Sequence, residues 1–211
     1  MPTQIASDNF ARASLGSNWT NPLGANDAFG IVSSTACGLL SGTNDYGGAM
    51  YWSGAGAFQP SQYSTTTYTR LGYATSVGNV HGWLGPAVLV QASGNNYSLY
   101  YNGGGQWALC RAYGYGLFTF YVTASHTPAI GDVMTLSAVP GVSSTALTGS
   151  VNGTPFISYT DSSSPLLTGT PGIWGFSYNS SYNGALVTPW SAGNNASAGV
   201  PNSLALMGCG T

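Results

Sequence analysis

The side chains that could carry out acid–base or nucleophilic chemistry are few in this chain of 211 residues. It contains no lysine and no glutamate, and its five aspartates and three arginines make up 4% of the residues. An ordinary globular domain carries about 25% charged residues. Catalytic lysines and glutamate pairs are therefore excluded. Three scattered arginines also cannot neutralise the phosphates of a nucleic acid, so we expect no nucleic-acid partner.

The two histidines, His81 and His126, raise the question of a Ser–His–Asp triad, which is defined by geometry rather than by sequence order. His126 follows Ser125 directly and precedes Asp132. No Gly-Xaa-Ser-Xaa-Gly nucleophile elbow occurs in the chain. The glycine fingerprints of phosphoryl transfer and dinucleotide binding are missing as well. We therefore expect no catalytic residue and no enzymatic activity.

Possible metal ligands are also sparse. Asn26–Asp27 and Asn44–Asp45 lie in glycine-bounded loops and could offer oxygens to Ca²⁺. The favoured alternative is that these side chains cap their own turns. Cys37, Cys110 and Cys209 are odd in number and lack zinc-ligand spacing, which leaves either buried thiols or one disulfide with a spare thiol. We expect no metal and no cofactor.

Aromatic residues provide the one candidate binding surface. Trp107, Tyr113 and Tyr115 could form a platform for sugar rings, with Asn95 and Asn96 nearby in sequence. The competing interpretation places these aromatics in a hydrophobic core, where aromatics that alternate along strands usually lie. Exposure of the three rings in a groove would favour glycan binding, and their burial would favour a core.

The elements that must position these residues are β-strands, because helical periodicity is nearly absent. Short alternating or apolar runs recur between Gly, Asn, Pro and Ser residues. The sharpest local signal is Asn152–Gly153 between two β-prone runs, which predicts a hairpin because both turn residues must accept positive φ. The other expected strands include Phe29–Ala36, Tyr63–Tyr73 and Ala185–Trp190. About a dozen such runs predict an all-β, single-domain, two-sheet antiparallel β-sandwich (jelly roll).

The expected domain covers residues 1–190, and residues 191–211 form a linker and an apolar tail. The linker is rich in small residues, and the apolar run Val200–Met207 follows it. This tail could dock on a neighbouring subunit or fold back onto its own sheet.

The start of the chain lacks the basic and apolar regions of a secretory signal, and no run of about 18 apolar residues occurs. We expect no membrane partner.

The neutral surface is itself informative, since the formal net charge is −2. Soluble β-proteins usually protect their sheet edges with charges, especially lysine. Net charge near zero also removes the repulsion that keeps molecules apart. A chain without either protection suits a packed, multi-copy particle or filament. Compositional bias of the host, or a saline or acidic habitat, is the alternative explanation.

The sequence resembles concanavalin A-like lectin/glucanase (LamG-like) domains from Asp8 to about Trp190. The opening segments Ser7–Ala13 and Leu15–Thr20 carry an Asp-Xaa-Phe, Ala-Arg-Ala and Gly-Xaa-Asn-Trp pattern. The matching segments of the second half are Gly131–Leu136, Val151–Gly153, Ser158–Asp161 and Gly172–Phe176.

The resemblance implies that the first strand pairs near the last, so that Phe10 and Trp190 close the sandwich. Enzymatic branches of these domains carry a Glu-Xaa-Asp-Xaa-Xaa-Glu strand, which a chain without glutamate cannot form. Stand-alone domains of this type are common in tailed-bacteriophage virions. The resemblance therefore implies a non-enzymatic structural protein located in the virion, such as a capsid decoration (cement) protein. Its partners would be the major capsid protein or tail components and other copies of itself, in a homo-oligomer. The alternative is a glycan-binding module of a tail fibre or a cell-surface assembly.

Overall fold

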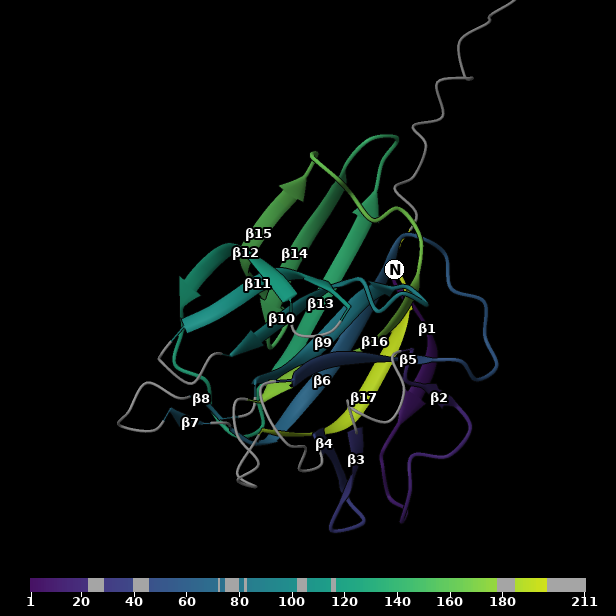
Figure 1. The fold of residues 1–211 in the computed structure, drawn as a ribbon, viewed down its shortest axis with the longest axis vertical. Helices are drawn as coiled ribbons and strands as arrows, with labels where there is room; N and C mark the ends of the chain where they lie inside the picture. Colours follow the sequence, from purple (N-terminus) through teal and green to yellow (C-terminus); the bar gives the residue numbers. More distant parts are fainter. Residues whose placement is uncertain are drawn as a thin grey trace, which may run out of the picture.

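The computed structural model describes residues 1–22, 29–39, 46–71, 73–74, 80–81, 83–101, 106–114, 117–177 and 185–196. These residues form antiparallel β-strands and contain no helix. In the same part of the chain, no segment forms a helix of the length and hydropathy needed to cross a membrane. The strands assemble into a two-sheet sandwich, as the sequence predicted (Figure 1).

The first sheet has eight strands in the described part of the chain. Its order is β15 (Thr154–Asp161), β14 (Thr145–Val151), β13 (Val133–Pro140), β6 (Gln62–Arg70), β17 (Leu186–Asn194), β4 (Ala36–Leu39) and β3 (Phe29–Val32), with β1 (Thr3–Asp8) also paired to β17. We call it the eight-stranded sheet. The first described strand thus lies beside the last, with Asp8 opposite Trp190.

The second sheet has seven strands among the described residues. Its order is β12 (Leu117–Ser125), β11 (Gln106–Tyr113), β10 (Asn96–Tyr101), β9 (Trp83–Val90), β16 (Thr170–Ser177), β5 (Tyr46–Trp52) and β2 (Trp19–Thr20). We call it the seven-stranded sheet. A separate pair of short strands is formed by β7 (Tyr73–Ala74) and β8 (Val80–His81).

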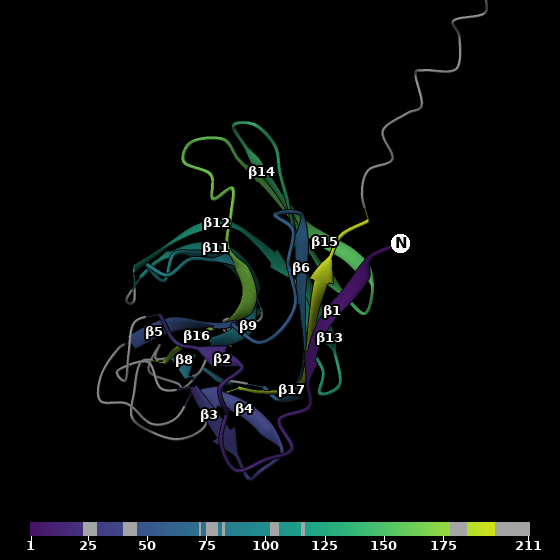
Figure 2. The same ribbon diagram turned by 90° about the vertical axis from the view of Figure 1, so that its right-hand side faces the viewer.

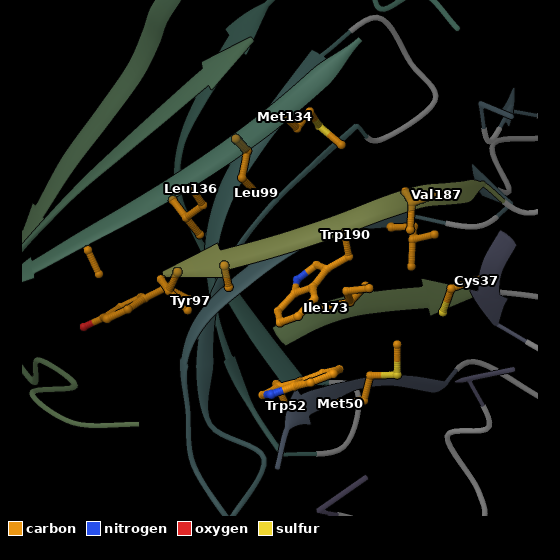
Figure 3. Close-up of a cluster of buried hydrophobic side chains, with 14 of the residues drawn as sticks. Cys37, Met50, Trp52, Tyr97, Leu99, Met134, Leu136, Ile173, Val187 and Trp190 are labelled. Carbon is orange, nitrogen blue, oxygen red and sulfur yellow. The ribbon is translucent and has the colours of Figure 1, made fainter. Parts of the chain in front are cut away.

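The main hydrophobic core lies between the two sheets. The seven-stranded sheet curves, and its convex side faces the eight-stranded sheet (Figure 2). Strand alternation directs Leu99, Leu136 and Ile173 into the space between the sheets, where all three are fully buried (Figure 3). Trp52 and Trp190 meet in the same core, with ring centroids 5.5 Å apart.

The hairpin predicted at Asn152–Gly153 is confirmed. Asn152 has φ of 52° and Gly153 has φ of 79°, and they join β14 to β15. The Asn152 carboxamide also holds the turn in place: its oxygen accepts the Val133 amide proton at 2.9 Å, and its nitrogen donates to Asp132 at 2.8 Å. Local turn chemistry therefore decides this part of the fold.

The strands expected from the sequence need correction in three respects. The expected single strand Phe29–Ala36 is two strands, because Ser33 and Ser34 have positive φ and turn the chain between β3 and β4. The strand β1 was not among the runs predicted from β-prone residues, although the resemblance implied a first strand near the last. β17 continues to Asn194, beyond Trp190, where the expected strand ends. Small residues fill its last positions, so hydropathy alone does not reveal the strand.

The outer, concave face of the seven-stranded sheet is apolar as well. Trp83, Tyr100, Trp174 and Phe176 pack together there and are almost fully buried, with the rings of Trp83 and Tyr100 stacked at 4.9 Å. Phe120 extends this cluster and is 47% exposed. The sheet therefore carries apolar side chains on both faces, and its concave face is a second core rather than an open row of rings.

Candidate functional site

A network around the Asp8 carboxylate organises the end of β1. Arg12 donates to both oxygens of Asp8, at 2.6 and 2.5 Å. The indole of Trp19 donates to Oδ2 at 2.7 Å, and the backbone N–H of Phe10 donates to Oδ1 at 2.8 Å. The backbone oxygen of Leu15 accepts two further bonds from Arg12, which fixes the guanidinium.

The charge state of Asp8 follows from these contacts. Asp8 is only 7% exposed, and this burial by itself opposes ionisation of its carboxyl group. The hydrogen bonds from Arg12 and Trp19 outweigh the effect of burial and hold the pKa of Asp8 below its ordinary value. Asp8 is therefore an ionised, fully occupied acceptor at neutral pH. It cannot serve as a general acid, which requires a raised pKa.

Four aromatic rings pack beneath this network. Trp19 contacts Phe10, Trp52 and Trp190 with centroid distances of 5.9, 5.5 and 4.6 Å. Phe10 and Trp190 are fully buried, and each contacts Trp19, at the place where β1 pairs with β17. The indole of Trp190 donates to the Ser64 hydroxyl at 2.9 Å. The aromatic cluster thus gives the network a rigid base.

A cleft of about 360 Å³ opens over the network, lined by Ser7, Asp8, Asn9, Arg12, Asn18 and Trp52. Its size falls within the range of small-molecule sites. In the described part of the chain, the side chains of Ser7 and Asn18 make no hydrogen bond, so they can bind a ligand. The Asn9 side-chain oxygen accepts from Ala11, which leaves its NH₂ group to donate.

These groups favour an uncharged, polar ligand. The Asp8 and Arg12 charges neutralise each other within the cleft, so no net charge attracts an ion. Carboxamide and hydroxyl groups both donate and accept hydrogen bonds, as sugar hydroxyls do. Trp52, which is only 9% exposed, adds an apolar side chain to the lining. Among the described residues, no group of three His, Cys, Asp or Glu side chains could hold a metal ion.

The arrangement of the strands has parallels among solved structures. An endo-1,3-β-glucanase from Streptomyces sioyaensis superimposes with a TM-score of 0.54 and 10% identity, over 92% of this chain and 97% of that chain. The β-glucanase of Bacillus licheniformis gives 0.52 at 9% identity, over 92% and 99%. The lectin UEA-II, solved in complex with galactose, gives 0.51 at 10% identity, over 92% and 100%.

The chain has the concanavalin A-like jelly-roll fold. The resemblance seen in the sequence is thus confirmed at the level of fold. No protein-family model matches the sequence, and no curated protein does. At about 10% identity the shared feature is the fold alone, so the chemistry of the cleft has to be argued from its own residues.

Of the two interpretations of the aromatic residues, the structure places Trp107 in the core rather than on a sugar platform. Trp107 is fully buried between the sheets and packs against Phe156 at 5.6 Å, because it alternates inward along β11. Tyr113 lies at the exposed end of the same strand, and the guanidinium of Arg111 lies 4.9 Å from its ring centre. Tyr115 lies outside the described residues, as do Asn26–Asp27 and Asn44–Asp45.

The histidine environment offers no nucleophile in the described part of the chain. Nε2 of His126 lies 3.8 Å from Asp132, but no hydrogen bond joins His126 to a serine or threonine there. The Asp132 carboxylate accepts from Asn152 and from the backbone of Ala129. This group therefore supports the turn before β13. The side chain of His81 lies outside the described residues.

A second buried carboxylate, Asp161, joins the two sheets at the opposite edge. It accepts the hydroxyls of Tyr97 and Tyr121 at 2.6 and 3.0 Å, and Arg111 lies 3.4 Å away. Burial opposes its ionisation, but the Tyr97 hydroxyl and the backbone amides of Ser163 and Ser164 hold its pKa below the ordinary value. This carboxylate is also unsuited to donate a proton.

Cys37 and Cys110 are free and fully buried thiols, while Cys209 lies outside the described residues. Sequence reasoning missed the cleft, although five of its six lining residues belong to the two opening motifs, Ser7–Ala13 and Leu15–Thr20. Only the pairing of distant strands shows that Trp52 completes it.

Proposed function

We propose that this protein is a non-catalytic, lectin-like protein that binds a neutral glycan in the cleft beside Asp8. One observation carries the proposal: the cleft is lined by Ser7 and Asn18, whose side chains make no hydrogen bond among the described residues, together with Trp52 and a neutralised ion pair. Solved proteins of the same fold include a lectin complexed with galactose and enzymes named for β-glucans, which supports sugar as the ligand class.

The two buried carboxylates support binding without hydrolysis. Glycoside hydrolysis needs one carboxyl group that holds a proton and a second carboxylate nearby. Hydrogen bonds keep both Asp8 and Asp161 ionised, and each serves a structural network. We therefore expect binding of glucans without release of reducing sugar.

The test is a glycan microarray followed by calorimetric titration of the sugars that bind. We expect Asn18→Ala to weaken binding by about tenfold, since it removes hydrogen bonds to the ligand. Asn95→Ala is the matched control, because Asn95 lies in the turn between β9 and β10, away from the cleft. Equal affinity of the wild type and Asn18→Ala would reject this site. Binding to no neutral glycan would reject the function.

A second candidate is a structural role on a virion, with major capsid or tail proteins as partners and self-association into a homo-oligomer. The observation that favours it is the outer face of the eight-stranded sheet, where the outward residues of β6, β13 and β14 are all uncharged. Such a face can be buried without the cost of desolvating charges. Density-gradient sedimentation of a source lysate tests this role, with chymotryptic peptides identified by mass spectrometry. Co-sedimentation with particles in a fixed ratio to the coat protein supports it, and recovery as a small free species rejects it.

A further inference from the structure

A line of hydroxyl groups crosses the outer face of the eight-stranded sheet and ends at the cleft. The strand registers place one serine or threonine of each of five neighbouring strands directly opposite the next. In order these are Ser7 on β1, Ser191 on β17, Thr65 on β6, Thr135 on β13 and Ser150 on β14. We call this set the hydroxyl row.

The hydroxyl row faces outward. Ser7 is exposed, and the other four members are half-buried, whereas their sequence neighbours on β6 and β13 point into the core. The hydroxyls of Thr65 and Thr135 lie 3.0 Å apart and bond each other, which shows that facing side chains share one side of the sheet. Adjacent strands are about 4.8 Å apart, so the row extends for about 19 Å.

Ser7 belongs both to the hydroxyl row and to the lining of the cleft. Ser7 faces the outer side of the sheet, whereas the next residue, Asp8, points inward at the cleft. Among the described strands β1 pairs only with β17, so a ligand in the cleft reaches the row by passing over the other edge of β1 at Ser7. Hydroxyl groups donate and accept equally well, and the outward positions of β6, β13 and β14 carry no charge. Such a surface matches a ligand that is itself long, uncharged and lined with hydroxyls.

We propose that the hydroxyl row is an extension of the cleft that binds a linear, uncharged polysaccharide chain, of which one end occupies the cleft. This inference rests on the proposed glycan-binding function and adds the class of glycan: a polymer rather than a single sugar or disaccharide. A ligand confined to the cleft contacts only Ser7 of the row, whereas a chain laid along the row also contacts Thr135 and Ser150.

The test measures affinity for β-1,3- and β-1,4-linked gluco-oligosaccharides from the disaccharide to the octasaccharide. Three variants are compared with the wild type. Thr135→Val/Ser150→Ala removes the far hydroxyls of the row, Asn18→Ala alters the cleft, and Ser158→Ala/Thr160→Val removes similar hydroxyls from β15, outside the row. None of these positions is buried, and circular dichroism verifies that the variants fold.

We expect the affinity of the wild type to rise with chain length. The Thr135→Val/Ser150→Ala variant should lose about tenfold in affinity for the octasaccharide and nothing for the disaccharide. Asn18→Ala should weaken binding at every length, and the β15 variant should match the wild type. Affinity that is independent of length, or a far-row variant that matches the wild type, overturns the extended site alone. Absence of binding at every length overturns the proposed function and this inference with it.

Discussion

The hydroxyl of Tyr97 on β10 donates to Oδ2 of Asp161 on β15 at 2.6 Å, across the boundary between the two sheets. Asp161 is fully buried, and the same oxygen also accepts the hydroxyl of Tyr121. The Tyr97 hydroxyl in turn accepts the backbone N–H of Leu166 at 2.9 Å. One phenol group thus joins both sheets and the loop that follows β15.

Removal of this phenol group should destabilise the fold. Tyr97→Phe deletes a hydrogen bond to a buried charge and leaves the Leu166 amide without its acceptor, so we expect the free energy of unfolding to fall by about 1.5–3 kcal/mol. Urea denaturation measures the change. Tyr159→Phe is the control, because Tyr159 stacks on Tyr121 at 4.2 Å through its ring. Equal losses for the two variants would contradict the role of the Tyr97 hydroxyl.

Stability should decline in acid because Asp8 and Asp161 have lowered pKa values in the folded protein. As the pH falls, the carboxyl groups of the unfolded chain take up protons near their ordinary pKa of about 4, before those of the folded protein do. The stabilisation from each carboxylate is thus complete above about pH 4 and is lost as pH falls toward the folded pKa values. We expect a constant melting temperature between about pH 5 and 7 and a steady decrease below about pH 4.

Asp161→Asn provides the control for this pH dependence. The variant should start from a lower melting temperature, because Arg111 loses its partner charge, and its decline in acid should be shallower than that of the wild type. A wild-type melting temperature that stays constant down to about pH 2 would show that the contacts lower the pKa of neither carboxylate.

Local chemistry made parts of the fold predictable from the sequence. Asn152–Gly153 specifies its hairpin because only residues that tolerate positive φ suit that turn. Ser33 and Ser34 adopt the same kind of backbone without the usual turn residues, so the split between β3 and β4 was not foreseen. The wider sandwich followed from the recurrence of short β-prone runs.

The site was much less predictable, because it depends on register between distant strands. The opening Asp-Xaa-Phe motif was recognised, but nothing local shows that the Asp8 carboxylate accepts the Trp19 indole. The inward direction of Trp107 and the alignment of Ser7 with Ser191 likewise depend on which strands pair. A shift of one residue in the pairing of β11 would turn Trp107 to the other face of its sheet, and the same shift in β1 would turn Ser7.

A substitution at Gly153 tests the backbone conformation of the hairpin turn without changing side-chain packing. A Cβ atom at Gly153 would meet no atom within 4 Å, so Gly153→Ala perturbs only the backbone at φ of 79°. We expect a loss of about 1 kcal/mol in the free energy of unfolding, since left-handed backbone is costly for alanine. Gly141→Ala is the control at another turn, where a Cβ would lie 3.5 Å from the Ser144 oxygen. No loss on Gly153→Ala would contradict the assigned turn.

The buried thiols should resist alkylation in the folded protein. Cys110 is fully buried, and burial raises the pKa of its thiol to about 12, while burial raises the pKa of Cys37 as well. Thiolate is the reactive form, so iodoacetamide at pH 8 should modify neither residue until urea unfolds the chain. Peptide mass spectrometry measures the modification of each cysteine. Rapid labelling of Cys110 in the folded protein would contradict its burial.

Gly54 connects the aromatic base of the cleft to its ligand-binding side chains. A Cβ atom at this position would lie 2.8 Å from the Trp52 ring and 2.9 Å from the side-chain oxygen of Asn18. Trp52 is held by its contacts with Trp19 and Trp190 and cannot move easily. Gly54→Ala should therefore displace Asn18 and weaken glycan binding by about tenfold, with a loss of about 1–3 kcal/mol in stability from overpacking.

Gly141→Ala again serves as the control, because Gly141 lies in the turn between β13 and β14 and is not part of the cleft lining. Titration with the glycan bound by the wild type measures affinity, and urea denaturation measures stability on the same samples. A stability loss without a change in affinity would contradict the placement of the ligand against Asn18 and Trp52. A loss of affinity in Gly54→Ala but not in Gly141→Ala would place the bound sugar against Asn18 and Trp52.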